Sequence, residues 1–110
     1  MKKTTKIYIA GHNGMVGSAI KRTLIAKGYK NIIGASSKDL DLKNQQAVTD
    51  FIAKEKPEVI IDAAARVGGI LANSNYPYQF LMENMQIQNN LIDASLQAGI
   101  EKFIFLGSSC

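Results

Sequence analysis

The chain has 110 residues, of which 46% are hydrophobic and 20% charged, so it is typical of one soluble globular domain or part of one. Its net charge is +4, but the basic residues are scattered and interleave with no aromatic stretch, which argues against nucleic-acid binding. The apolar run "IYIA" is too short for a signal-peptide core or a membrane span, and the single cysteine, Cys110, has no internal disulfide partner. We therefore expect a cytoplasmic protein with no membrane partner and no bound metal.

Short apolar strands alternate with helical patterns along the whole chain. In order, the patterns predict a strand, helix, strand, helix, strand, helix and strand over 6–10, 15–28, 31–35, 44–56, 58–65, 77–98 and 102–107. This alternation indicates a parallel sheet with right-handed crossovers, and the continuous apolar strands indicate helices on both faces. We predict an α/β, Rossmann-type fold with strand order 3-2-1-4, which reverses between the first and fourth strands. Ligands of such sheets bind at the reversal, beyond the carboxyl ends of the strands.

Three glycines, Gly11, Gly14 and Gly17, stand three residues apart between the first strand and the first helix. They suit a sharp turn, a close approach of the backbone to a ligand, and close packing of the helix on the sheet. The free N–H groups of the helix start suit a pyrophosphate. A tight turn without a ligand is the alternative, but the flanking strand and helix favour a dinucleotide. The predicted cofactor-binding residues here are Gly11, His12, Asn13, Gly14, Met15, Val16 and Gly17.

The window after the second strand reads "ASSKDLDL", so two serines and a lysine precede the first acid, Asp39. A site for NAD needs a carboxylate at this point to bind the ribose 2′-hydroxyl. Hydroxyl groups and a cation suit the 2′-phosphate of NADP better, which favours Ser37 and Lys38 as its ligands. Asp41 and Leu42 are placed beside the adenine. The alternatives are a solvated loop, or an Asp39 that turns inward and selects NAD.

The third strand ends in "DAAA". The small side chains of Ala63, Ala64 and Ala65 would let a cofactor lie close, although ordinary core packing explains them equally well. Asp62 lies inside an apolar strand, where an unpaired carboxylate is costly, and a hydrogen bond to a neighbouring loop is the one account of it that the sequence suggests.

The helix predicted over 77–98 carries two apolar strips. The strip with Phe80, Ile87, Leu91 and Ala98 is predicted to face the sheet. The other strip needs a second cover, which is either a later helix or a second subunit. It consists of Met82, Met85, Ile92 and Leu96.

Five segments, "GHNGMVGSAI", "AAARVGGILAN", "NYPYQF", "QNNLIDA" and "FLGSSC", resemble the GDP-L-fucose synthase family of extended short-chain dehydrogenase/reductases. The resemblance covers nearly the whole chain. It implies a homodimer built on the 77–98 helix, and NADPH-dependent epimerisation and reduction of GDP-4-keto-6-deoxy-mannose. It also implies that Ser108 is catalytic, that Cys110 is an acid/base, and that Arg66 and Asn73 border the sugar nucleotide. Further cofactor contacts are implied at Leu106, Gly107, Ser108 and Ser109.

The chain departs from this family at Asn13, where members often carry a basic residue, and it lacks an arginine near Ser37, which leaves Lys38 as the only nearby cation. None of the four tyrosines has a lysine four residues later, so the Tyr-x-x-x-Lys pair of the superfamily is missing. We therefore expect residues 1–110 to be an NADP-binding domain without the substrate half, and inactive alone. A non-catalytic dinucleotide-binding module and another nucleotide-sugar epimerase or dehydratase are the alternatives. In residues 1–110 alone, the strand predicted over 102–107 would be an unpaired edge of the sheet that carries the apolar stretch "FIFL". Natural proteins avoid such an edge, which favours the enzyme over the binding module.

Overall fold

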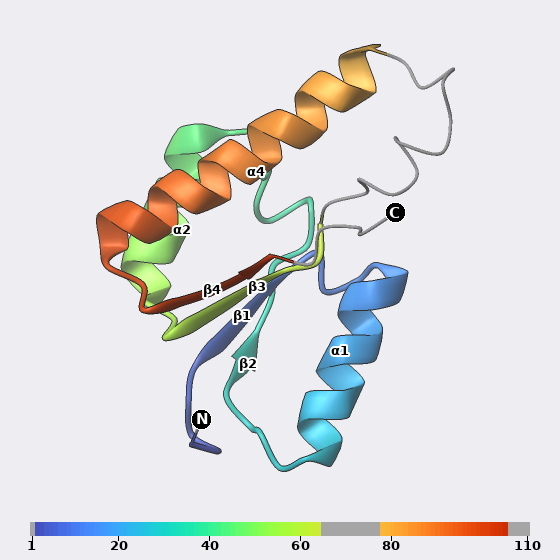
Figure 1. Cartoon of the computed structure of the whole chain (residues 1–110), viewed down its shortest axis with the longest axis vertical. Coiled ribbons are helices and arrows are strands. Elements are labelled where there is room, and N and C mark those ends of the chain that lie inside the picture. The colour runs from blue at the N-terminus through green and yellow to red at the C-terminus, as the bar shows by residue number, and fades with distance from the viewer. Residues whose placement is uncertain (1, 65–77, 106–110) are drawn as a thin grey trace.

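The computed structural model describes residues 2–64 and 78–105. In chain order, its elements are β1 (Ile7–Ala10), α1 (Met15–Ala26), β2 (Ile32–Ile33), α2 (Gln45–Glu55), β3 (Val59–Asp62), α4 (Tyr78–Ala98) and β4 (Lys102–Phe105). Each element lies within a predicted segment, and the Rossmann-type parallel α/β fold is confirmed (Figure 1). The strands are shorter than predicted, most of all β2, which has 2 residues.

Local sequence explains where the helices begin and end. Asn44 precedes α2, and its side chain accepts a hydrogen bond from the Ala47 N–H at 3.1 Å, which is a standard N-terminal cap. Lys56 ends α2 in the left-handed conformation, with φ 46°, and Pro57 follows. Gly28, with φ 97°, follows the last turn of α1.

The four strands form one parallel sheet in the order β2-β1-β3-β4. Ile7 of β1 pairs with Ile32 on one side and with Val59 on the other, so β1 lies between β2 and β3. Asp62, the last residue of β3, stands between Ala10 of β1 and Phe105 of β4.

The predicted strand order 3-2-1-4 is therefore wrong. It assumed that α1 and α2 carry the chain in the same direction across the sheet. The two helices instead cover opposite faces (Figure 1), and right-handed crossovers on opposite faces travel in opposite directions. The crossover through α2 returns past β1, so β3 pairs with β1 and β4 pairs with β3. The order reverses between β1 and β3, and the loops that follow these two strands become neighbours.

Alternate residues of the strands bury their side chains on the two faces of the sheet. On the first face, α2 and α4 lie side by side (Figure 1) and cover a core that includes Tyr8, Ala10, Val48, Ile52, Ile60, Leu91 and Ala94. On the second face, α1 packs Ile20 and Leu24 against Ile7, Ile9, Val59 and Ile61. Helices thus cover both faces, as predicted.

One strip of α4 faces the sheet and another faces outward, as the pattern predicts, but the side chain of Phe80 lies outside the described part of the chain. Leu91 is fully buried, and Ile87 packs against the same core. Ala98, which was predicted on the buried strip, is exposed, and Ala94 one turn earlier is buried instead. The outward residues are 43–76% exposed, namely Met82, Met85, Ile92 and Leu96. Across the described residues, no helix is both long and apolar enough to cross a membrane.

Candidate functional site

The glycine-rich loop, residues 11–17, joins β1 to α1 at the point where the strand order reverses. Gly11 has φ 81°, and a Cβ built on it would lie 2.9 Å from both the N and the Cα of Ala64. A Cβ on Gly17 would overlap the carbonyl oxygen of Gly11, so the start of α1 packs directly on the turn. Glycine is therefore required by the fold at both positions.

Gly14 differs from the other two glycines. Its φ of −74° and ψ of 172° are open to any residue. A Cβ on Gly14 would meet only the Gly11 carbonyl oxygen, at 3.4 Å, which is about an ordinary contact. The packing of the described residues does not require glycine here, so a close approach by a group outside the described residues is the better reason for it.

The start of α1 presents free backbone donors beside this opening. Gly14 is the N-terminal cap and has no side chain that could satisfy them. The first helical hydrogen bond runs from the Ser18 N–H to the Gly14 carbonyl, at 2.9 Å. The N–H groups of residues 15–17 therefore precede the helical hydrogen bonds, and with the partial positive charge of the helix end they suit an anion.

A pocket of about 550 Å³ joins the glycine-rich loop to the 36–43 segment, which follows β2. This volume lies within the usual range for small-molecule sites. Most of the residues predicted for the cofactor from these two segments line it, namely Gly11, His12, Asn13, Gly14, Ser37, Lys38, Asp41 and Leu42. The prediction missed several others, which are Ala35, Ser36, Leu40, Lys43 and Ile87.

The first acid of the 36–43 segment does not line this pocket. Asp39 closes a turn in which its N–H donates to the Ser36 carbonyl at 3.0 Å. Its Oδ2 accepts a hydrogen bond from the Ser36 hydroxyl at 3.1 Å. Lys43 lines the pocket together with Lys38, so the expectation that Lys38 is the only nearby cation is wrong. The pocket wall thus combines serines and two lysines, with Asp41 as its acid.

Helix α4 fixes the far side of the 36–43 segment. The side-chain amide of Asn90 donates to the Leu42 carbonyl at 2.9 Å, and that of Gln86 donates to the Lys43 carbonyl at 2.8 Å. Asn90 is buried, and Ile87 between these two residues lines the pocket. Sequence reasoning missed this support, because it depends on the long-range contact between α4 and the 36–43 segment.

His12 connects the two loops across the pocket. A Cβ on Gly34 would lie 2.5 Å from Cγ of the His12 ring, so the ring rests against the backbone just after β2. The imidazole can occupy this place only because residue 34 has no side chain. Gly34 was not singled out from the sequence, because its spacing from the glycine-rich loop matches no motif.

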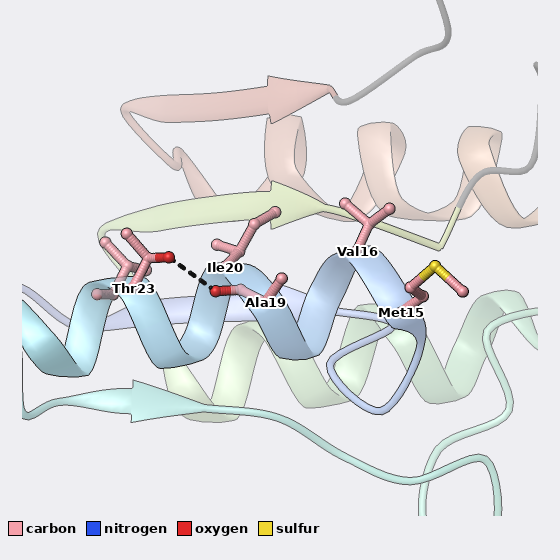
Figure 2. A pocket seen from close by; sticks show the side chains of 6 residues that line it. Met15, Val16, Ala19, Ile20 and Thr23 are labelled. Carbon is pink, nitrogen blue, oxygen red and sulfur yellow. Dashed lines mark hydrogen bonds between the residues drawn. The ribbon is translucent and has the colours of Figure 1, made fainter.

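Two predicted residues point elsewhere. The side chains of Met15 and Val16 line a second pocket, of about 400 Å³, along α1 together with Ala19, Ile20 and Thr23 (Figure 2). The Thr23 hydroxyl in this pocket donates to the Ala19 carbonyl at 2.9 Å, and the other side chains are apolar. This pocket offers little for chemistry. Met15 and Val16 remain at the glycine-rich loop only through their backbone.

Ala63 and Ala64 lie beside Gly11 and do not line the larger pocket. The other predicted site residues lie outside the described part of the chain, namely Ala65, Arg66, Asn73, Leu106, Gly107, Ser108, Ser109 and Cys110.

Asp62 is fully buried at the end of β3. Its Oδ1 accepts a hydrogen bond from the Ala64 N–H at 3.1 Å, which confirms the expected bond to a neighbouring loop. Burial raises the pKa of Asp62 to about 6, and the Ala64 N–H and the Gln88 side chain act in the opposite direction. The side-chain amide of Gln88 lies near Asp62, but its Nε2 and Oε1 atoms form no hydrogen bond within the described residues. Burial also raises the pKa of Tyr8, with a smaller contribution from Asp62.

Comparison with known proteins gives one consistent result. Residues 7–110 match the NAD dependent epimerase/dehydratase family. The chain is 48% identical to "GDP-L-fucose synthase 1" of Arabidopsis thaliana over 108 residues, which are 98% of this chain and 33% of that protein. It is 46% identical to "GDP-L-fucose synthase" of Escherichia coli (strain K12) over 105 residues, 96% of this chain and 33% of the relative. The chain thus spans about one third of the length of these relatives.

A solved structure agrees with these sequence matches. It is "MlghC, GDP-mannoheptose C4 reductase from Campylobacter jejuni with NADP bound". It superposes with a TM-score of 0.85 at 40% identity, over 96% of this chain and 33% of that one.

Proposed function

Because the chain belongs to the NAD dependent epimerase/dehydratase family, we propose that the pocket between the glycine-rich loop and the 36–43 segment binds NADP(H). The observation that carries this proposal is Gly14. The fold leaves room for a side chain at this residue, and yet the pocket opens directly onto its bare backbone.

The pyrophosphate is assigned to the start of α1. The N–H groups of residues 15–17 precede the helical hydrogen bonds, and no side chain caps them. A charge placed at such a helix end is typically stabilised by about 0.3–1 kcal/mol, and the bare backbone at Gly14 lets it come close.

The adenosine end of the cofactor is assigned to the 36–43 segment. Ser37, Lys38 and Lys43 supply hydroxyl and cationic groups for a 2′-phosphate. The carboxylate of Asp39, which would favour NAD, is held by Ser36. The Campylobacter jejuni reductase, whose structure has NADP bound, supports the same choice.

We infer that the chain serves in a reductase of a GDP-linked keto sugar, with GDP-4-keto-6-deoxy-mannose as the substrate and GDP-L-fucose as the product. The names of the relatives support this. Bound NADPH would supply the hydride for the keto group. Ser108 is assigned to the carbonyl oxygen and Cys110 to proton transfer during epimerisation, while Arg66 and Asn73 are assigned to the sugar nucleotide.

Reduction also needs a proton donor at the oxygen, and we propose that residues 1–110 alone do not supply one. Burial raises the pKa of the Tyr8 phenol, so Tyr8 is a poor acid. Tyr29 packs against Lys3, whose Nζ lies 4.3 Å from the ring centroid. Tyr29 precedes β2, whereas the glycine-rich loop follows the parallel strand β1, so the two lie at opposite ends of the strands. A positioned acid contributes about 10²–10⁴-fold in rate, so its absence would be plain in an assay.

The test is to express residues 1–110 and the whole natural reading frame, and to follow NADPH oxidation with GDP-4-keto-6-deoxy-mannose. Only the longer product should turn over, and its sequence should contain a Tyr-x-x-x-Lys pair. Turnover by residues 1–110 would refute the assignment of the acid. If the whole reading frame binds NADPH without turnover, a non-catalytic dinucleotide-binding module is favoured. Activity on another nucleotide sugar instead would refute the assigned substrate and favour another epimerase or dehydratase.

We also propose that the protein is a homodimer through α4. Its outward side chains Met82, Met85, Ile92 and Leu96 form an apolar strip on a helix that is already buried on its other side. Such a strip is typical of an interface. Light scattering at micromolar concentration tests this, and a monodisperse monomer would refute it.

A further inference from the structure

Four polar residues are buried in the described part of the chain, and among them Asp62 is the one that can carry a charge, the others being Thr5, Asn90 and Ser95. Asp62 lies at the carboxyl end of β3, opposite Ala10 of β1. Its Oδ1 accepts the hydrogen bond from Ala64, whereas its Oδ2 has no partner within the described residues. A carboxyl in this state is costly to the fold, so folding alone does not account for it.

Ala64, whose N–H donates to Asp62, is also the residue against which Gly11 of the glycine-rich loop packs. The pairing of β1 with β3 ends with the Ala63 N–H, which donates to the Ala10 carbonyl at 2.9 Å. Asp62 then fixes the next N–H, that of Ala64. Ala64 in turn leaves no room for a Cβ on Gly11. The two loops at the strand-order reversal thus touch backbone to backbone, and their spacing depends on where Ala64 lies.

The surroundings of the carboxyl do not neutralise it. From β1 it faces the Tyr8 phenol, whose raised pKa keeps it uncharged, and from α4 it faces the Gln88 amide. No cation among the described residues is paired with it. Burial raises the pKa of Asp62 to about 6, which is still below neutral pH. Groups that proteins keep at a cost to stability are concentrated at functional sites.

We propose that Asp62 is a positioning residue of the cofactor site: its carboxylate holds the Ala64 N–H and thereby keeps the loop after β3 packed against Gly11. Gly11 begins the glycine-rich loop, so a displaced Ala64 would let the pyrophosphate-binding backbone move. The role of Asp62 in binding rests on the proposed NADP(H) function. The contact between Gly11 and Ala64, which joins the two loops, is independent of that function.

The experiment compares two variants in the protein expressed from its natural reading frame. Asp62→Asn keeps an acceptor oxygen for the Ala64 N–H, whereas Asp62→Leu has the same branched arrangement of heavy atoms and no acceptor. Ser95→Ala is the control, because it removes a buried hydroxyl that donates to the Leu91 carbonyl at 2.7 Å, away from the pocket. NADPH affinity is measured by fluorescence titration, and hydrogen exchange of the Ala64 amide is measured without cofactor.

We expect Asp62→Leu to weaken NADPH binding by about tenfold, the usual scale for a lost hydrogen bond to a charged group, and to speed the exchange of the Ala64 amide. Asp62→Asn should keep affinity and exchange close to wild type, and Ser95→Ala should change neither. Both Asp62 variants should resist urea at least as well as wild type at pH 7, because each removes a buried charge.

Wild-type affinity and exchange in Asp62→Leu would overturn the proposal, as would equal losses in Asp62→Asn and Asp62→Leu. A loss of urea resistance that parallels the loss of affinity would also overturn it, because that pattern indicates a residue that only supports the fold. If the wild-type protein binds no NADPH, the proposed function fails instead, and the exchange of the Ala64 amide still decides whether Asp62 holds the loop.

Discussion

Gly14→Ala and Gly17→Ala separate a glycine that serves the fold from one that serves a ligand. A Cβ on Gly14 meets the Gly11 carbonyl oxygen at 3.4 Å, and the backbone there suits any residue. A Cβ on Gly17 overlaps the same oxygen and lies 3.0 Å from the Cα of His12. The first substitution should therefore be accepted by the fold and the second should not.

The magnitudes follow from these contacts. At position 14, alanine is a poorer helix cap than glycine by about 1 kcal/mol, but it also restricts the unfolded chain, which returns about 0.4–1 kcal/mol. The net change in the free energy of unfolding should stay within about 1 kcal/mol. At position 17, the overlap is with backbone atoms and cannot be relieved by a side-chain rotation. The helix must move away from the turn, at about 1–3 kcal/mol or more.

The assay measures urea unfolding and NADPH affinity for both variants, and adds Gly14→Val. The branched side chain of Gly14→Val occupies the opening where the pyrophosphate is proposed to approach, so it should reduce affinity by at least about tenfold while the fold survives. Gly17→Ala should lose both stability and affinity.

Two results would refute the reasoning. If Gly14→Val binds NADPH as tightly as wild type, the pyrophosphate does not lie against this backbone. If Gly14→Ala unfolds as readily as Gly17→Ala, then the fold itself requires glycine at position 14, and the open space around it is no sign of a ligand.

Three further predictions concern other parts of the site. Ser37→Asp should weaken NADPH binding by about tenfold and spare NADH, since the new carboxylate repels a 2′-phosphate; a native preference for NADH in parallel kinetics would contradict this. Gly34→Ala places a Cβ 2.5 Å from Cγ of His12, so it should displace the imidazole ring. This variant should bind NADPH more weakly with little change in urea resistance. Unchanged affinity would show that the ring is not part of the site. Asp62 has a folded pKa of about 6 against an ordinary 3.8, so its contribution to stability is greatest below about pH 4 and falls by roughly 3 kcal/mol as the pH rises to about 6. Urea titrations should show this fall in wild type relative to Asp62→Asn, and parallel pH profiles of the two proteins would refute the assignment.

The sequence predicted every helix and strand that the structure describes in residues 2–64 and 78–105, because the signals for them are local. Apolar spacing, the cap at Asn44 and the breaks at Gly28 and Pro57 act within a few residues of the elements that they define. The strand order was not predictable in the same way. It depends on which face of the sheet α2 covers, and that is decided by long-range packing of Val48 and Ile52 against the core shared with α4.

The candidate site likewise has parts that local sequence predicts and parts that depend on long-range packing. The glycine-rich loop and the "SSK" stretch were found because each is contiguous and its chemistry can be read from neighbouring residues. Ile87 and Asn90 reach the site only when α4 lies against the 36–43 segment, and no spacing in the sequence indicates that contact. Gly34 is a related case, because the reason for it is the His12 ring from another loop.

Gly14 and Asp62 share one feature, which is that the packing of the described residues explains neither of them. At Gly14 the described neighbours leave room for a side chain and there is none, and at residue 62 the core holds an acid whose pKa is raised by burial. Both residues lie at the strand-order reversal, Gly14 on the loop that follows β1 and Asp62 at the end of the neighbouring strand β3. Local sequence preferences and the needs of the core agree across most of the chain, so the places where they are overruled indicate a separate requirement. We propose that this requirement is cofactor binding at the opening where Ala64 packs against Gly11 and the pocket reaches the bare backbone of Gly14.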